Sequence, residues 1–254
     1  MSEQRIAVVT GASSGIGEAT ARRLSKDGWH VVLVARRRER LERLAAELGS
    51  ATAVAVDLTD PAAPAAVAER CRERGALHLL VNNAGASWRA AFGDPERGGA
   101  ANVERTLALN FLAVVRLTEA LLPLLRTSAP SAIVNVSSVA GRIALARQGA
   151  YAASKHALIG WSDALRAEER RHGVHVGVVL PGFIATEGFP HRGLRRNPLT
   201  RWIVSKPDRV ASAIVAAGPG RRAERYVPRP YALVPALRLL APPLWRALTA
   251  RMSM

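Results

Sequence analysis

The sequence contains few residues of several types. Among its 254 residues there is one cysteine, Cys71, there are three lysines, and aromatic side chains make up 5%. A single cysteine excludes an intrachain disulfide and argues against a cysteine-based metal site, so we expect no bound metal. No uninterrupted apolar run approaches the roughly 20 residues of a membrane-spanning helix, and the N-terminus lacks a secretory signal pattern. These absences predict a cytoplasmic protein.

The charge of the chain is strongly positive. The formal net charge is +16, and arginine carries most of it. Such an excess attracts nucleic acids, acidic lipid surfaces and phosphorylated cofactors without distinguishing among them. A nucleic-acid reader usually interleaves basic residues with stacking aromatics, and this chain shows neither that pattern nor a recognisable reading motif. We therefore predict no specific nucleic-acid partner.

Short β-branched runs alternate with longer helical patterns along the chain. The runs are almost entirely apolar, which is typical of strands that helices cover on both faces of a parallel sheet. A helical pattern follows the second run, with Leu41, Leu44 and Leu48 at helical spacing and Gly49 as its end, and Asp60-Pro61 resembles a helix start. We predict a single-domain, Rossmann-like α/β fold, a doubly wound parallel sheet with helices on both faces. The predicted strands are 6–10, 31–35, 51–56, 77–81, 132–136, 174–180 and, more weakly, 225–227.

A glycine-rich turn, TGASSGIG, follows the first predicted strand. Gly11, Gly15 and Gly17 let the backbone turn tightly and approach a pyrophosphate, and the next helix offers free N–H groups at its N-terminus. Thr20 stands where the dinucleotide-binding pattern has its last glycine. By itself this turn is equally compatible with a plain strand-to-helix connection.

Tyr151 and Lys155 occur four residues apart in a long helical pattern and so lie on one face of the helix. A cation beside a phenol favours the phenolate, so we expect Lys155 to lower the pKa of Tyr151 and to make it an acid/base group. The strand before this helix ends in Ser137-Ser138, and an earlier strand ends in NNAG, residues 82–85. The carboxyl ends of parallel strands are where such sheets bind ligands.

Taken together, TGASSGIG, NNAG, LALNF, Ser138, YAASK and PGFIAT resemble the motif series of the short-chain dehydrogenase/reductase family, in its short single-domain branch. The resemblance implies that Tyr151 exchanges a proton with the substrate oxygen, Lys155 holds the nicotinamide ribose and Ser138 orients the substrate carbonyl. It also implies that Asn110 positions a water, although Asn110 could instead bridge strand and helix backbones. Ser137 is the alternative to Ser138.

The resemblance further implies a nicotinamide cofactor bound along the carboxyl edge of the sheet. In this family an acid at the end of the second strand binds the ribose 2′-OH of NAD. Here Ala35 has that place and Arg36 follows, so we predict NADP(H), with Arg36 on the 2′-phosphate and NAD(H) as the alternative. Arg37, Arg38 and Arg40 are assigned to a solvated helix start that pairs with Glu39 and Glu42. The predicted cofactor-binding residues are Gly11, Ser13, Ser14, Gly15, Ile16, Gly17, Arg36, Asp57, Leu58, Asn83, Ala84, Gly85, Tyr151, Lys155, Pro181, Gly182, Ile184 and Thr186.

The segment after Pro181-Gly182 is glycine- and proline-rich, and the family resemblance implies that it covers the substrate. Phe183, Phe189 and Trp202 belong to it. By analogy Trp88, Ala140, Arg142 and Gln148 are further pocket residues, and ordinary packing or solvation is the equal alternative for them. We divide the chain into a catalytic and NADP-binding domain at 1–227 and a proline-rich, apolar and basic tail at 228–254. The tail packs over the substrate mouth or on another subunit, or it contacts a membrane interface.

The resemblance implies hydride transfer between NADP(H) and a small carbonyl or alcohol substrate, which we expect to be apolar. It also implies a homo-oligomer, a dimer or a tetramer. Two other functions remain as alternatives. One is a catalytically idle cofactor-binding protein, which would have no need of Tyr151, Lys155, Ser138 and Asn110 together. The other is nucleic-acid binding, which the net charge alone supports.

Overall fold

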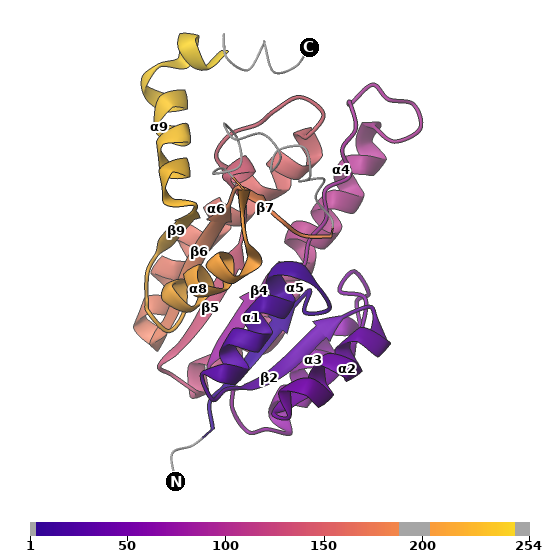
Figure 1. Cartoon of the computed structure of the whole chain (residues 1–254), viewed down its shortest axis with the longest axis vertical. Coiled ribbons are helices and arrows are strands. Elements are labelled where there is room, and N and C mark those ends of the chain that lie inside the picture. Colours follow the sequence, from indigo (N-terminus) through magenta and orange to yellow (C-terminus); the bar gives the residue numbers. More distant parts are fainter. Residues whose placement is uncertain (1–3, 188–203, 247–254) are drawn as a thin grey trace.

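The computed structural model describes residues 4–187 and 204–246. Its centre is a seven-stranded parallel sheet in the order β3-β2-β1-β4-β5-β6-β9 (Figure 1). The seven predicted strands are all present, with ends that differ by at most two residues. They are β1 (Ile6–Thr10), β2 (His30–Ala35), β3 (Ala51–Ala55), β4 (Leu79–Asn82), β5 (Ser131–Val136), β6 (Val174–Pro181) and β9 (Glu224–Val227). A short parallel pair that the sequence did not predict joins β7 (Phe183–Ile184) to β8 (Val204–Ser205).

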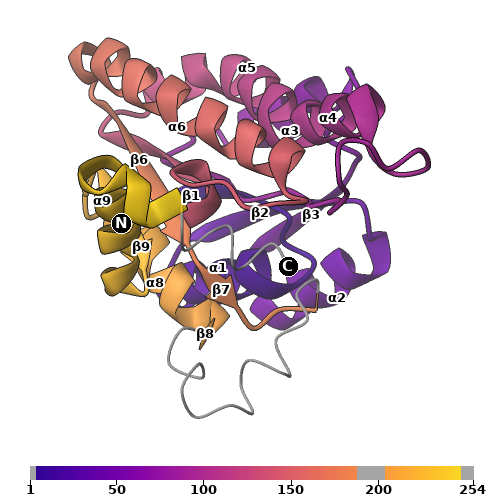
Figure 2. The same cartoon turned by 90° about the horizontal axis from the view of Figure 1, so that it is seen from above.

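Helices cover both faces of the sheet, as the near-continuous apolar strands predict (Figure 2). On one face lie α3 (Ala63–Arg72), α4 (Gly99–Leu107), α5 (Ala113–Thr127) and α6 (Gly149–Glu169). On the other lie α1 (Gly15–Lys26), α2 (Arg38–Leu48) and α8 (Pro207–Ala217). Shorter helical segments span Ala108–Leu112, Val139–Gly141, Arg170–His172 and Arg229–Ala232, and α9 (Leu233–Leu240) follows the last strand.

Neighbouring residues of each central strand face opposite layers of the core. In β1, Val9 packs with the layer under α1 and α8, whereas Val8 packs with the layer under α3 and α5, and both are fully buried. In α2, Leu41 and Leu44 are buried and Gly49 ends the helix, as expected. The helix start predicted at Asp60 is two residues early, because the Asp60 carboxylate accepts the Ala62 N–H in a turn before α3.

One long helical stretch, Gly99–Thr127, joins α4 and α5 through a π-helical turn at Ala108–Leu112. By length and composition alone it could cross a membrane, and among the described residues it is the one helix that meets that test. Its Leu117, Leu121 and Leu125 are buried in the core beneath the sheet, as in the core helix of a globular fold. The π-helical turn carries Asn110.

The strand order places a switch point between β1 and β4. From β1 the chain continues through β2 and β3 toward one edge, and β4, β5, β6 and β9 continue toward the other. The connections that leave β1 and β4 therefore diverge, and a crevice opens at their carboxyl ends. The glycine-rich turn and Ser138 follow strands at this edge, NNAG begins with the last residue of β4, and Pro181 is the last residue of β6.

Candidate functional site

The glycine-rich turn after β1 is held in a shape that side chains would not allow. Gly11 and Gly15 have φ values of +68° and +59°, in the left-handed region that favours glycine. A Cβ on Gly17 would lie 2.2 Å from the Gly11 carbonyl oxygen, so α1 packs against the turn only because residue 17 is glycine. Helix α1 begins at Gly15 and directs its first free N–H groups toward the crevice. This geometry is suited to an anionic phosphate group.

The NNAG segment is hydrogen-bonded to Thr10, just before the glycine-rich turn. The Thr10 hydroxyl accepts hydrogen bonds from the backbone N–H groups of Asn83 and Ala84, at 2.9 and 3.0 Å. The Asn83 side chain donates to the Thr10 carbonyl at 2.8 Å. A Cβ on Gly85 would lie 3.0 Å from the Asn110 side-chain oxygen and 3.5 Å from the Lys155 ammonium, so this turn also approaches the residues of α6 closely.

Ser138, Tyr151 and Lys155 come together at the end of β5. Lys155 is 4% exposed; its ammonium donates to the Val136 carbonyl at 2.9 Å and lies 5.8 Å from the centroid of the Tyr151 ring. The Ser138 hydroxyl donates to the Pro181 carbonyl at 3.3 Å and accepts the Ala140 N–H at 3.1 Å, and it lies near enough to the Tyr151 phenol to influence its pKa. Ser137 instead donates to the Lys155 carbonyl at 3.0 Å and is buried, so that of the two serines Ser138 is the one that meets the phenol.

Burial controls the pKa values of this cluster. It lowers the pKa of Lys155 to about 8, because the charged ammonium is held away from water. Burial also raises the pKa of Tyr151 above its usual value, and the nearby Ser138 hydroxyl opposes that rise only in part. The expectation that Lys155 lowers the phenol pKa is therefore wrong for the ligand-free protein. Tyr151 is a neutral phenol at pH 7.

Asn110 lies one layer behind this cluster and is fully buried. Its amide accepts the Ala86 N–H and donates to the Ala86 carbonyl, both at 2.9 Å, and it also donates to the Ser154 hydroxyl at 3.1 Å. The side chain thus connects the segment after β4 to α6, which agrees with the alternative role of Asn110 as a bridge between strand and helix. Its placement of a water in a proton relay stays a prediction.

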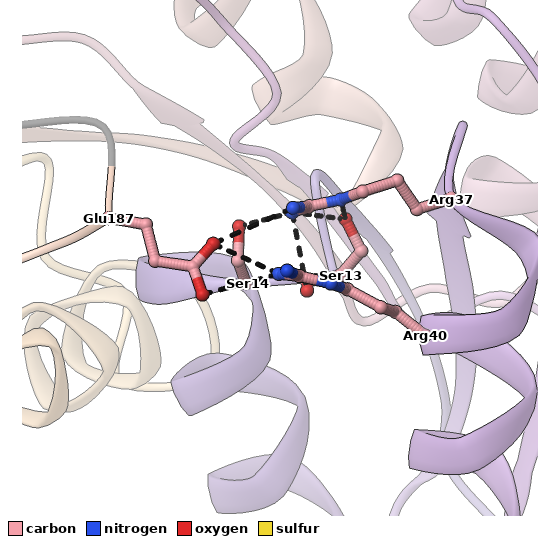
Figure 3. A network of polar contacts seen from close by, with 5 residues as sticks. All are labelled: Ser13, Ser14, Arg37, Arg40 and Glu187. Atoms are coloured by element: carbon pink, nitrogen blue, oxygen red, sulfur yellow. Dashed lines mark hydrogen bonds and ion pairs between the residues drawn. The ribbon is translucent and has the colours of Figure 1, made fainter.

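The arginines after β2 do not behave as one solvated group. Arg37 reaches back to the glycine-rich turn and donates to the Ser13 hydroxyl at 3.0 and 3.1 Å and to the Ser14 hydroxyl at 2.7 Å (Figure 3). Arg40 pairs with Glu187 at 2.9 Å. Assigning Arg37 and Arg40 to a helix start that pairs within itself was therefore wrong.

Two further arginines of this run have different partners. Arg38 pairs with Glu42 at 3.6 Å within α2, as expected. Arg36 is 75% exposed, and its guanidinium lies 3.9 Å from the carboxylate of Asp57, which accepts two hydrogen bonds from Thr59. Those two hydrogen bonds lower the pKa of Asp57, and Arg36 adds to the effect.

A cavity of about 890 Å³ extends along the carboxyl edge of the sheet. Nearly all the predicted site residues line this cavity. The exceptions are Gly17 and Asn110, which do not reach its walls. Sequence reasoning missed Arg37, Arg105 and Glu187, which also line it, because nothing local distinguishes them from other charged surface residues. The predicted residues that line it are Gly11, Ser13, Ser14, Gly15, Ile16, Arg36, Asp57, Leu58, Asn83, Ala84, Gly85, Ser138, Tyr151, Lys155, Pro181, Gly182, Ile184 and Thr186.

The residues assigned to the pocket by analogy are only partly found there. Trp88 lines the cavity and has the Arg105 guanidinium 5.0 Å from its ring centroid. Ala140, Arg142 and Gln148 are absent from its walls, and Arg142 pairs with Glu224 at 2.7 Å. Phe189 and Trp202 lie outside the described residues.

The first part of the predicted tail packs on the Pro181-Gly182 turn. The Phe183 and Tyr231 rings are in edge contact with centroids 6.4 Å apart, and a Cβ on Gly182 would lie 2.5 Å from the Tyr231 ring. Helix α9 then projects from the body (Figure 1), and Leu233, Leu239 and Leu240 are strongly exposed.

The donors of the cavity fit a phosphorylated dinucleotide. Side chains in place of the glycines would crowd the glycine-rich turn, which leads into the N-terminus of α1. Guanidinium and hydroxyl groups lie beside the end of β2. Among the described residues only Asp57 and Glu187 bring carboxylates to the walls of the cavity. The Gly-rich turn is thus suited to a pyrophosphate, and the basic side to a further phosphate.

Comparison with known proteins points to one family. A family model described as short chain dehydrogenase matches residues 5–195. Dehydrogenase/reductase SDR family member 7B of Bos taurus is 38% identical over 193 residues, which are 71% of this chain and 58% of that relative. Ketoacyl reductase HetN of Nostoc sp. is 33% identical over 215 residues, covering 83% of this chain and 74% of the relative. The chain therefore spans less than two thirds of the length of the bovine relative.

Proposed function

Because the chain belongs to the short-chain dehydrogenase family, whose members use a nicotinamide cofactor, we propose that it transfers a hydride between NADP(H) and a small carbonyl or alcohol substrate. One observation carries the proposal. Ser138, Tyr151 and Lys155 line the same cavity as the glycine-rich turn, so the residues proposed for proton transfer and those proposed for dinucleotide binding share one cavity. The bound nicotinamide supplies or takes the hydride.

The side chains of the cluster handle the proton. Tyr151 is protonated at neutral pH because burial raises its pKa, so it can donate a proton to a carbonyl oxygen that becomes an alcohol. Ser138 donates to the same oxygen and stabilises its developing charge. Lys155 reaches the ribose hydroxyls from the floor of the cavity. Reduction is the proposed working direction because NADPH usually serves reductions.

The substrate class follows from the cavity walls. Trp88, Leu109 and Ile184 give apolar surface to the cavity that Tyr151 lines, which supports a substantially apolar substrate. The name of the relative ketoacyl reductase HetN also supports carbonyl reduction. A nicotinamide-absorbance screen over aldehydes, ketones and alcohols of graded chain length tests the proposal. Absence of turnover across the panel, in a protein that binds the cofactor, would favour the catalytically idle alternative.

The preference for NADP(H) rests on the end of β2. Ala35 leaves no carboxylate to repel a 2′-phosphate, and Arg36 and Arg37 both line the cavity there. Arg37 is held by Ser13, so its guanidinium is already positioned. We expect Arg36→Asp and Arg37→Asp each to raise the KM for NADPH far more than that for NADH. Equal losses with both cofactors would contradict a 2′-phosphate role, and Arg38→Asp is the matched control.

We also propose that the protein is a cytoplasmic enzyme with a catalytic domain at residues 1–227 and a tail at residues 228–254. The tail contacts an anionic membrane surface. Leu239 and Leu240 are 76% and 86% exposed, and the sequence after Glu224 contains arginines but no acidic residue. Vesicles containing phosphatidylglycerol should carry the protein upward in a flotation gradient, and neutral vesicles should not. A Leu239→Ser/Leu240→Ser protein that floats equally well would contradict this contact.

Self-association is the last part of the proposal. Apolar side chains reach the outer faces of α5 and α6 at one end: Leu112, just before α5, is 49% exposed, and Phe111 beside it is in edge contact with Trp161 of α6. We propose that these faces pair in a homo-oligomer, a dimer or a tetramer. Light scattering coupled to size exclusion should give a multiple of the chain mass of 27.1 kDa, and Leu112→Glu should reduce it.

A further inference from the structure

Glu187 carries an unexpected negative charge at the basic side of the cavity. It follows β7 and lies against the start of α2, as Figure 3 shows. Its two carboxylate oxygens lie 2.9 and 3.3 Å from the Arg40 guanidinium, and one lies 3.6 Å from that of Arg37. Arg40 and, to a lesser degree, Arg37 lower the pKa of Glu187, so it is ionised at neutral pH.

Arg37 also binds the glycine-rich turn. Through Nε and Nη2, Arg37 donates to Ser13 and Ser14, and its Nη1 is the atom that faces Glu187. Ser13, Ser14, Arg37 and Glu187 all line the cavity beside the end of β2. This is the position at which the proposed function puts the 2′-phosphate of NADP(H).

A carboxylate and a phosphate compete for one guanidinium. Both accept charge-assisted hydrogen bonds from its fork of N–H groups, and two anions on the same side of it repel each other. A cofactor with a free 2′-OH leaves the contacts of Glu187 with Arg37 and Arg40 intact. A 2′-phosphate has to displace the carboxylate or share its donors.

We propose that Glu187, held in place by Arg40, is a specificity-determining residue that opposes the 2′-phosphate by occupying Arg37. It thereby reduces the discrimination between NADP(H) and NAD(H) that the arginines alone would give. This inference rests on the proposed use of NADP(H). Exposed ion pairs of this kind change equilibria only modestly, so we expect Glu187 to weaken binding of the 2′-phosphate by about 2- to 5-fold.

The test is equilibrium binding of cofactor fragments by isothermal titration calorimetry at low ionic strength. Adenosine 2′,5′-bisphosphate carries the 2′-phosphate, and adenosine 5′-monophosphate lacks it. Glu187→Gln should bind the bisphosphate about 2- to 5-fold more tightly and the monophosphate with unchanged affinity. Salt at about 0.5 M should shrink the gain, because the charges are exposed. Glu42→Gln is the matched control. It removes one negative charge from the Arg38–Glu42 pair within α2, and neither residue of that pair lines the cavity.

The outcomes separate this inference from the proposed function. If the wild-type protein prefers the bisphosphate and Glu187→Gln leaves that preference unchanged or weakens it, the role of Glu187 is wrong and the use of NADP(H) stands. If neither protein prefers the bisphosphate, the NADP(H) assignment itself fails and the role of Glu187 fails with it. Glu187→Ala serves as a second variant, and circular dichroism checks that both remain folded.

Discussion

Replacing Lys155 by methionine should stabilise the ligand-free protein at neutral pH. The Lys155 side chain is 4% exposed, its ammonium donates to one backbone carbonyl, that of Val136, and among the described residues no carboxylate pairs with it. Burial of a charge with so few partners costs free energy, which is why the pKa of the ammonium falls to about 8. Methionine has a similar length and carries no charge.

The size and the pH dependence of the effect follow from that pKa. A fall from 10.5 to about 8 corresponds to about 3 kcal/mol, at about 1.4 kcal/mol for each pH unit. The folded state binds the proton less tightly than the unfolded state, so the destabilisation is fully present below pH 8. It disappears as the pH rises through 10.5, where both states are neutral. Loss of the hydrogen bond to Val136 offsets about 1 kcal/mol of the gain.

Urea unfolding without cofactor, followed by circular dichroism between pH 7 and pH 10.5, measures this effect. The Lys155→Met protein should be more stable than wild type by about 2 kcal/mol at pH 7, and this advantage should disappear at about pH 10, where the remaining cost of burying the charge only balances the lost hydrogen bond. Lys206→Met is the control, because Lys206 is exposed and the same comparison should give little change. A Lys155→Met protein that is less stable at pH 7, or a difference that does not vary with pH, would refute the reasoning.

Three further predictions concern other parts of the molecule. Tyr151→Phe should lower kcat by about 10²- to 10⁴-fold while fluorescence titration shows NADPH binding retained; substantial turnover would remove Tyr151 from proton transfer. Arg126→Met leaves the 3% exposed carboxylate of Glu169 without its bidentate partner and should lower the midpoint of urea unfolding at pH 7. That partner lowers the pKa of Glu169, so the loss should shrink as the pH falls below about 4.5, and a loss constant with pH would contradict it. Gly17→Ala brings a Cβ to 2.2 Å from a backbone oxygen and should abolish NADPH binding, whereas Gly160→Ala, with nothing within 4 Å, should raise the unfolding temperature.

Local patterns were enough for the fold and for the residues of the ordered motifs. Strand residues such as Val8 and Val9 had to be apolar on both faces, and that continuity signals a covered parallel sheet. Tyr151 and Lys155 share a helix face at a fixed spacing, so their proximity follows from helix geometry alone. The ends of these elements were less well defined, as the start of α3 shows, because a turn and a first helical residue differ by a single hydrogen bond.

Other features required the packed chain. The contact of Arg37 with Ser13 joins residues 24 apart, and that of Arg40 with Glu187 joins residues 147 apart. No local pattern reveals such pairs, because an arginine at a helix start can turn toward solvent or back onto a loop. The direction of the Tyr151 pKa was likewise decided by the surroundings of the ring. A neighbouring lysine in the sequence does not say how much water the phenol keeps.

By itself, then, the sequence determined the covered parallel sheet, the glycine-rich turn and the spacing of the residues predicted to be catalytic. These depend on the periodicity of strands and helices and on residues that only one backbone shape accepts. The tertiary structure alone decided which arginine meets the turn, which carboxylate lies beside that arginine, and how burial shifts the pKa values of Lys155 and Tyr151. Those properties depend on distances across the fold and on exclusion of water, and neither exists until the chain is packed.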